Sequence, residues 1–184
     1  MTMILDGSNG LTMPTWTTTT RPANPIIGQQ GYNTTYGGVE VYNGSAWDLI
    51  TGGPAFSAYM GAGQSLSNGS LTKVAFNTKQ FDTNNNYDTT NYRFTPTVAG
   101  YYQINVSVYL GGMYANSWAS IYKNGNEWQR GNQATQQNVN VSSLIYCNGS
   151  TDYIEAYAIQ TSGSTQSIGA YSFMTFSGSM TRAA

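Results

Sequence analysis

The stretch that decides the fold is Tyr102–Leu110, which reads YQINVSVYL. Its aliphatic residues fall on every second position, which is the period of a β-strand with one buried face. Residues 139–147 and 153–158 alternate in the same way. No apolar repeat of about 3.6 residues persists anywhere in the chain, so we expect an all-β protein with very little helix.

Turn residues divide these alternating runs into short strands. Asn124-Gly125 joins 118–123 to 127–130, and both residues tolerate positive φ, which predicts a type I′ hairpin. About eight to ten such segments follow residue 55, at the spacing typical of a β-sandwich or jelly roll. The residues expected in its core are Phe76, Phe94, Tyr102 and Phe176, with Cys147 as a small buried hydrophobe.

The composition is unusually poor in charge. Charged residues make up 8% of the 184 residues, against about 25% in an average soluble protein, while 14% are aromatic. Amyloid-like low complexity is one interpretation of a chain rich in Asn and Gln, but the orderly alternation argues against it. The net charge of −1 offers no basic patch for nucleic acid. With so little repulsion, identical copies can pack closely together.

The N-terminal residues 1–6 lack a basic region and a long apolar region, so we expect no signal peptide. No stretch approaches the ~20 apolar residues of a membrane span. We therefore expect a soluble protein that is made in the cytoplasm and is not inserted into a membrane.

The chain divides into three parts on sequence grounds. Residues 1–20 are expected to form an extended arm, because their turn residues and threonines supply no core. Residues 21–53 contain two short β-like runs and an Asn43-Gly44 turn, which predicts a small β-hairpin and linker module. Residues 54–184 carry the alternating strands and are expected to form the head domain.

Part of the predicted module resembles a segment that recurs in tail-fibre and other virion proteins of bacteriophages. The matching positions are Arg21-Pro22, Pro25-Ile-Ile-Gly28-Gln29, Gly31-Tyr-Asn33-Thr-Thr35 and Glu40-Val-Tyr42-Asn43-Gly44-Ser45-Ala-Trp47. In those proteins the segment links a virion-attachment end to a distal domain. The resemblance implies that the N-terminal arm anchors the chain to other virion proteins. It also implies a location in the virion, after synthesis in the host bacterial cytoplasm.

Residues 55–182 resemble the globular head of complement component 1q and its tumour-necrosis-factor relatives. The matching positions are Ala55-Phe-Ser57-Ala58, Val74-Ala-Phe76, Phe81-Asp82, Tyr92-Arg-Phe94-Thr95-Pro96, Ala99-Gly100-Tyr101-Tyr102, Ile121-Tyr-Lys-Asn124-Gly125 and Phe176-Ser177-Gly178. The resemblance implies a jelly-roll sandwich of about ten strands that assembles as a homotrimer. Some relatives bind calcium through carboxylate clusters, whereas Asp82, Asp88 and Asp152 are isolated here, so we expect no metal site.

Catalytic chemistry is poorly supplied. The chain has no histidine, the commonest general base and zinc ligand. Asp152 and Glu155 are close in sequence, but three positions apart on a strand they would point to opposite faces. No other pair of carboxylates suggests glycoside hydrolysis. We therefore expect neither enzymatic activity nor a cofactor.

Binding chemistry is richer, because Tyr, Trp, Asn and Gln together suit a glycan or a polar protein surface. Most of the aromatic residues are expected to pack between strands or between subunits. The candidate receptor-facing residues, which we place in loops, are Tyr114, Trp118, Trp128, Arg130, Gln136 and Gln137.

Three functions fit these features. The first is a trimeric tail-fibre subunit whose head binds a glycan or protein on the host surface. The second is a capsid decoration, cement or head-fibre protein, and the third is a secreted adhesion or signalling module. The expected lack of a signal peptide and the phage-like segment favour the first two, which the sequence does not separate.

Overall fold

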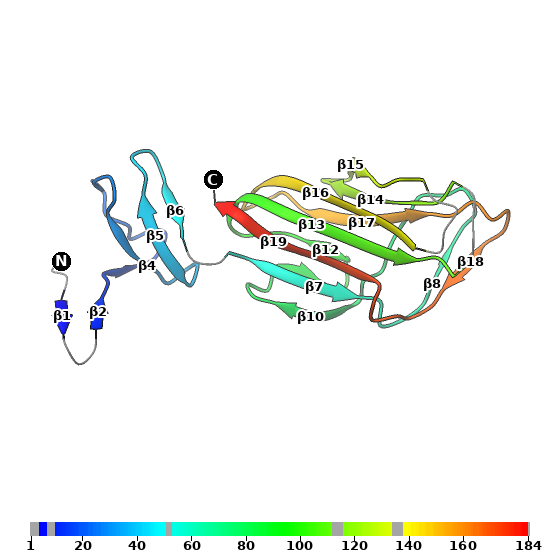
Figure 1. Ribbon diagram of the computed structural model, residues 1–184, viewed down its shortest axis with the longest axis horizontal. Coiled ribbons are helices and arrows are strands. Elements are labelled where there is room, and N and C mark those ends of the chain that lie inside the picture. The colour runs from blue at the N-terminus through cyan, green and yellow to red at the C-terminus, as the bar shows by residue number, and fades with distance from the viewer. Residues whose placement is uncertain (1–3, 7–9, 51–52, 112–115, 134–137, 184) are drawn as a thin grey trace. The chain divides into compact units, whose positions relative to one another are not determined.

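The computed structural model describes residues 4–6, 10–50, 53–111, 116–133 and 138–183. Its contacts divide the chain into two compact units, residues 1–53 with 182–184, and residues 54–181. Both units are built from β-strands, and the described residues contain no helix (Figure 1). The prediction of an all-β protein is therefore confirmed.

The N-terminal unit contains a four-stranded sheet in the order β3-β4-β5-β6 and a separate hairpin of β1 and β2. The strand bounds are β1 Ile4–Asp6, β2 Gly10–Thr12, β3 Thr15–Trp16, β4 Gln30–Asn33, β5 Gly38–Tyr42 and β6 Trp47–Leu49. Strand β3 runs parallel to β4, and the other two pairings in that sheet are antiparallel. The expected Asn43-Gly44 turn joins β5 to β6, with a φ of 105° at Gly44.

A buried carboxylate organises this unit. Glu40 of β5 is fully buried and accepts hydrogen bonds from Trp16 Nε1 and from Arg21 Nε, each at 3.0 Å. The Trp16 ring also packs edge-on against Trp47, with the ring centroids 4.9 Å apart. Residue 16 therefore belongs to the core of the module. The expected boundary after residue 20 is corrected accordingly: the segment outside the module can only precede Thr15, because β3 pairs with β4.

The head, residues 54–181, is a sandwich of two antiparallel sheets (Figure 1). One sheet has the order β10-β7-β19-β13-β16, and the other has the order β11-β12-β17-β14-β15 with β9 beside β17. A short pair, β8 and β18, lies apart from both. The strand bounds are β7 Ala55–Tyr59, β8 Gln64–Leu66, β9 Thr72–Lys73, β10 Thr78–Asp82, β11 Tyr87–Asp88, β12 Arg93–Phe94, β13 Ala99–Tyr109, β14 Trp118–Lys123, β15 Asn126–Arg130, β16 Asn138–Asn148, β17 Ile154–Ile159, β18 Gln166–Ile168 and β19 Thr175–Ala183. These strands outnumber the expected ones because β9, β11 and β12 are only two residues long, too short to show an alternation.

The core lies between the two sheets. Strands β13 and β16 pair along their whole length, from Ala99 opposite Asn148 to Tyr109 opposite Asn138. The even positions of β13 point into the core, and the hydroxyl of Tyr102 donates a hydrogen bond to Val98 O at 2.7 Å. The expected core residues Phe76, Phe94, Tyr102, Phe176 and Cys147 are all fully buried. Burial also raises the pKa of the Cys147 thiol to about 12, as an inert core residue requires.

The predicted hairpin at Asn124-Gly125 is confirmed. Both residues have positive φ, 53° and 77°, and they join β14 to β15. The register of this pair shifts by one residue between Glu127 and Gln129, which leaves Trp128 without a partner on β14. Such a bulge turns a side chain away from the regular sheet and blunts an edge strand.

Candidate functional site

The outer face of the five-stranded sheet is uncharged over most of its width. Strands β7, β13 and β16 contain no charged residue, and β19 contains only Arg182. The outward residues of β13 and their partners on β16 are Tyr101 and Tyr146, Gln103 and Leu144, Asn105 and Ser142, Ser107 and Asn140, and Tyr109 and Asn138. Charged groups keep most protein surfaces hydrated, so this face, which we call the uncharged face, is suited to contact with another protein surface.

Aromatic side chains lie at both ends of the uncharged face. Tyr101 and Tyr146 pack together at one end, with their rings 5.5 Å apart, and each is about two-fifths exposed. Near the other end Tyr171 stacks on Phe173 at 5.0 Å, and both rings contact Tyr109. Phe173 is 57% exposed, the largest value for an aromatic ring among the described residues. Exposed rings with few rotatable bonds are characteristic of interface residues.

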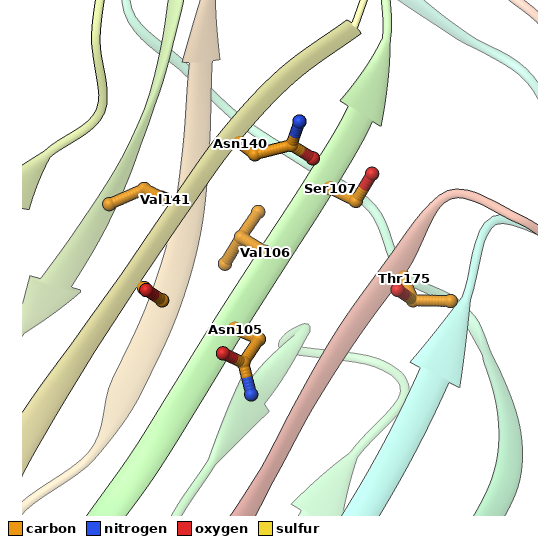
Figure 2. Close-up of a pocket in the computed structure, with 7 residues that line it drawn as sticks. Asn105, Val106, Ser107, Asn140, Val141 and Thr175 are labelled. Atoms are coloured by element: carbon orange, nitrogen blue, oxygen red, sulfur yellow. The ribbon is translucent and has the colours of Figure 1, made fainter.

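A polar trough of about 270 Å³ occupies the middle of this face (Figure 2). Its lining residues are Asn105 and Ser107 of β13, Asn140 and Ser142 of β16 and Thr175 of β19, above Val106 and Val141. Figure 2 shows the amide groups of Asn105 and Asn140 and the hydroxyl of Ser107 around Val106. The uncharged face therefore combines aromatic ends with a neutral, hydrogen-bonding middle.

The outer face of the six-stranded sheet has the opposite character. The strand register aligns Glu127, Tyr122, Glu155 and Arg93 in one row and Arg130, Ser120, Tyr157 and Lys73 in the next. Lys73 Nζ lies 2.7 Å from Glu155 Oε1, and an Arg130 nitrogen lies 2.7 Å from Glu127 Oε2. Between these ion pairs the rings of Tyr122 and Tyr157 are 4.1 Å apart. We call this surface the charged face.

The ion pairs of the charged face perturb the titration of their neighbours. Hydrogen bonds from Arg130 lower the pKa of the Glu127 carboxyl, and Ser120 donates to the same group. Burial beside the Glu155 carboxylate raises the pKa of the Tyr157 hydroxyl to about 12. At neutral pH the Glu127 carboxyl is therefore ionised and the Tyr157 hydroxyl is protonated, so Glu127 acts as an acceptor and Tyr157 can donate.

The structure brings together two of the predicted receptor-facing residues. The guanidinium of Arg130 lies over the Trp118 ring, 4.6 Å from its centroid. Trp128 is 50% exposed and lies elsewhere, beside Lys123 at the edge of the sandwich. All three belong to strands β14 and β15, so their expected placement in loops is corrected. Tyr114, Gln136 and Gln137 lie outside the described residues.

Sequence reasoning missed the role of Lys123, which joins the two sheets at this edge. Its ammonium contacts Asp152 Oδ2 at 2.9 Å and donates to the backbone oxygen of Tyr146 at 2.7 Å. It also lies 5.7 Å from the ring centroids of both Trp128 and Tyr146. Although burial opposes ionisation of Asp152, hydrogen bonds from Asn124 and Lys123 lower the pKa of its carboxyl. No sequence signal identified this contact, because its members lie far apart along the chain.

Two further classes of site are absent from the described part of the chain. No group of three or more Cys, Asp or Glu side chains there is arranged to hold a metal ion. None of the described segments forms a helix long and apolar enough to cross a membrane.

Comparison with known proteins identifies the fold. No family model matches the sequence, and no curated protein matches it. The chain is similar in structure to the globular domain of zebrafish complement 1qA, with 14% identity, a TM-score of 0.52 and coverage of 71% of this chain and 98% of that one. It is similar to murine APRIL with 10% identity, a TM-score of 0.55 and the same coverage. The head therefore has the jelly-roll fold of the complement 1q and tumour-necrosis-factor type.

A third similar structure extends further along the chain. PRD1 vertex protein P5 has 15% identity and a TM-score of 0.52, and the match covers 86% of this chain and 85% of that one. This share exceeds the 71% covered by the complement and APRIL domains. The match therefore includes residues of this chain beyond those that the complement and APRIL matches cover.

Proposed function

We propose that this chain is a non-enzymatic structural protein of a bacteriophage virion, a trimeric fibre subunit that attaches by its N-terminal part and contacts the host surface with its head. The likeness to PRD1 vertex protein P5 supports a virion role, because it covers more of the chain than the head fold alone. The phage-like segment at residues 21–47 supports the same role independently of the head.

The observation that carries the trimer is the contrast between the two outer faces of the head. The uncharged face exposes Tyr101, Leu144 and Phe173 and has no ion pair to desolvate when another copy covers it. Burying such a face is favourable, at about 25 cal/mol per Å² of apolar area. The charged face carries the ion pairs Lys73–Glu155 and Arg130–Glu127, which would lose solvation if another copy covered them. We infer that copies associate through the uncharged face and present the charged face outward.

Attachment to the particle is assigned to the N-terminal unit. Ile26 and Ile27 are 73% and 77% exposed, the two most exposed large hydrophobic residues in the described chain. They lie on a turn closed by a hydrogen bond from Gln29 N to Ile26 O at 2.9 Å, with Gly28 at a φ of 83°. A rigid turn that presents two isoleucines loses little entropy when it docks on another virion protein.

A charge placed on the uncharged face tests the assembly. Ser107→Lys would bring three lysines together in the trimer, so the variant should be monomeric. Thr90→Lys, in the exposed turn before β12, is the matched control and should remain trimeric. Light scattering should give three times the chain mass of 19.9 kDa for the natural protein and the control, and one chain mass for Ser107→Lys. A natural protein at one chain mass would refute the proposed trimer.

Receptor binding is tested by competition. Purified full-length protein should bind host cells and slow the adsorption of intact phage. The paired variants Trp118→Ala and Arg130→Gln should weaken blocking if the charged face contacts the receptor, because aromatic and Arg residues dominate such contacts. Binding that is unchanged in both variants would exclude this face as the contact surface.

Capsid decoration is the second candidate function. A vertex is a position on a capsid, so the likeness to a vertex protein favours this alternative. Locating the chain in an electron-microscopy reconstruction of the virion, on the tail or on the capsid, separates the two functions. If a saturating concentration of the purified full-length protein neither binds cells nor slows phage adsorption, capsid decoration is favoured.

A further inference from the structure

A second pocket, of about 360 Å³, lies beside the hairpin of β11 and β12. Asn85, Asp88, Arg93 and Thr95 are among its lining residues. The volume is within the range of about 300–1,000 Å³ that is usual for sites that hold a small molecule. The pocket lies on the sheet that carries the charged face, away from the uncharged face assigned to assembly.

Arg93 supplies the pocket with a cation that forms no salt bridge with any described carboxylate. The ion pairs among the described residues are made by Arg21, Lys73, Lys79, Lys123 and Arg130, and none of them includes Arg93. Two carboxylates lie opposite Arg93 in the register, Asp88 of β11 and Glu155 of β17. Glu155 is held by Lys73 Nζ at 2.7 Å and by the Tyr157 hydroxyl at 3.3 Å. The Arg93 guanidinium instead lies over the Tyr153 ring, 4.8 Å from its centroid. That contact orients the guanidinium and leaves its N–H donors available.

The acidic residue of the pocket, Asp88, accepts hydrogen bonds from residues of its own loop. Asp88 Oδ1 accepts from the backbone N–H groups of Thr90 at 2.7 Å and Asn91 at 3.0 Å. Its Oδ2 accepts from the Asn91 amide at 2.6 Å, and these bonds lower the pKa of the carboxyl. Asp88 therefore shapes the hairpin that carries Arg93, and its charge partly balances that of Arg93, which lies directly opposite it across the β11–β12 pair. A ligand would be selected by short-range hydrogen bonds and not by the net field.

Further donors surround Arg93. The side-chain oxygen of Asn85, Oδ1, accepts a hydrogen bond from Lys79 Nζ at 3.1 Å. The amide hydrogens of Asn85 therefore point away from Lys79. The Thr95 hydroxyl makes no hydrogen bond within the described part of the chain. Asn85 and Tyr92, the residue before Arg93, both have a φ of 53°, a left-handed conformation that is costly for a tyrosine. Strained backbone of this kind persists where surrounding structure enforces it, and it is concentrated at functional sites.

We propose that this pocket binds the carboxylate of an acidic saccharide, such as a uronic acid residue of a surface glycan. Arg93 would hold the two carboxylate oxygens in a bidentate contact, the geometry for which a guanidinium is best suited. Asn85 and Thr95 would bind the ring hydroxyls. The biological meaning of this site, as part of receptor contact, rests on the proposed function, but the binding itself does not.

Ligand-observed saturation-transfer NMR on the full-length protein tests the proposal. The probe is D-glucuronate, and D-glucose is its matched neutral control because the two sugars differ only in the group at carbon 6. Glucuronate should receive saturation from the natural protein and glucose should receive much less. Equal transfer to both sugars, or none to either at millimolar concentration, would overturn the proposal.

Variants locate the binding. Arg93→Gln should weaken glucuronate binding by about tenfold or more, and Arg93→Lys, which keeps the charge without the fork, should be intermediate. Arg182→Gln is the matched control, since it removes the same charge from an exposed position on β19, in the other sheet. Undiminished binding in both Arg93 variants would exclude the site. If the natural protein binds glucuronate but not host cells, the receptor function is refuted and the pocket is not. If the natural protein binds host cells but not glucuronate, the pocket is refuted and the receptor function is not.

Discussion

Replacing Glu40 by glutamine should unfold the N-terminal unit and leave the head folded. The Glu40 side chain is 1% exposed and receives donors from both Trp16 and Arg21. Glutamine has the same size, but it removes the negative charge and places an amide donor opposite groups that are themselves donors. Arg21 then loses its partner in a partly buried position.

The magnitude follows from that arrangement. Removing one partner of a buried ion pair costs about 3–5 kcal/mol, because the remaining charge is left uncompensated. The lower end applies here, since the Arg21 side chain is 22% exposed and can reach water. A unit of this size has a stability of only about 3–5 kcal/mol. A loss of about 3 kcal/mol therefore removes most of it.

Limited chymotrypsin digestion with mass spectrometry is the assay. In Glu40→Gln, cleavage should move to Trp16 and other aromatic residues of the N-terminal unit, while the head resists. Asp48→Asn is the matched control, because Asp48 makes one exposed hydrogen bond, with Asn43 at 2.9 Å, and should cost less than about 1 kcal/mol. If Glu40→Gln resists digestion as well as the control does, the buried network does not stabilise the unit and the reasoning fails.

Three further predictions concern stability. Burial opposes ionisation of Glu40, but hydrogen bonds from Arg21 and Trp16 hold the pKa of its carboxyl below the ordinary 4.5. Its contribution to stability is therefore present above that pH and is lost as the pH falls below it, so an acid-active protease should begin to cleave the N-terminal unit as the pH is lowered below 4.5. Phe176→Ala should destabilise the head by about 3–5 kcal/mol in urea unfolding, because Phe176 is fully buried among other aromatic rings, and an effect under about 1 kcal/mol would mean that this cluster has been misassigned. Deleting residues 1–12 should leave the N-terminal unit folded. Deleting residues 1–20 removes Trp16 and should unfold that unit while the head stays folded. Circular dichroism and digestion of the two truncated proteins can establish both outcomes.

Local signals predicted much of the fold. The alternation of Tyr102–Leu110 identified the buried side of β13, because a strand exposes successive side chains to opposite faces whatever its partner is. Asn124-Gly125 predicted its hairpin because both residues accept positive φ. The site was predicted less well: Trp118 and Arg130 meet as a pair, but Trp128 does not join them.

By itself the sequence determined what each segment is: its strands, their buried sides, the tight turns and the low charge that lets copies approach. Only the tertiary structure decided which segments meet. The uncharged face joins β7, β13, β16 and β19, and its character is invisible until they lie side by side. Trp16 reaches Glu40 only because β3 pairs with β4, and Glu155 forms its ion pair with Lys73 only because β9 and β17 lie side by side. The physical reason is that periodicity and turn chemistry depend on neighbouring residues, whereas strand pairing and burial depend on contacts between distant ones.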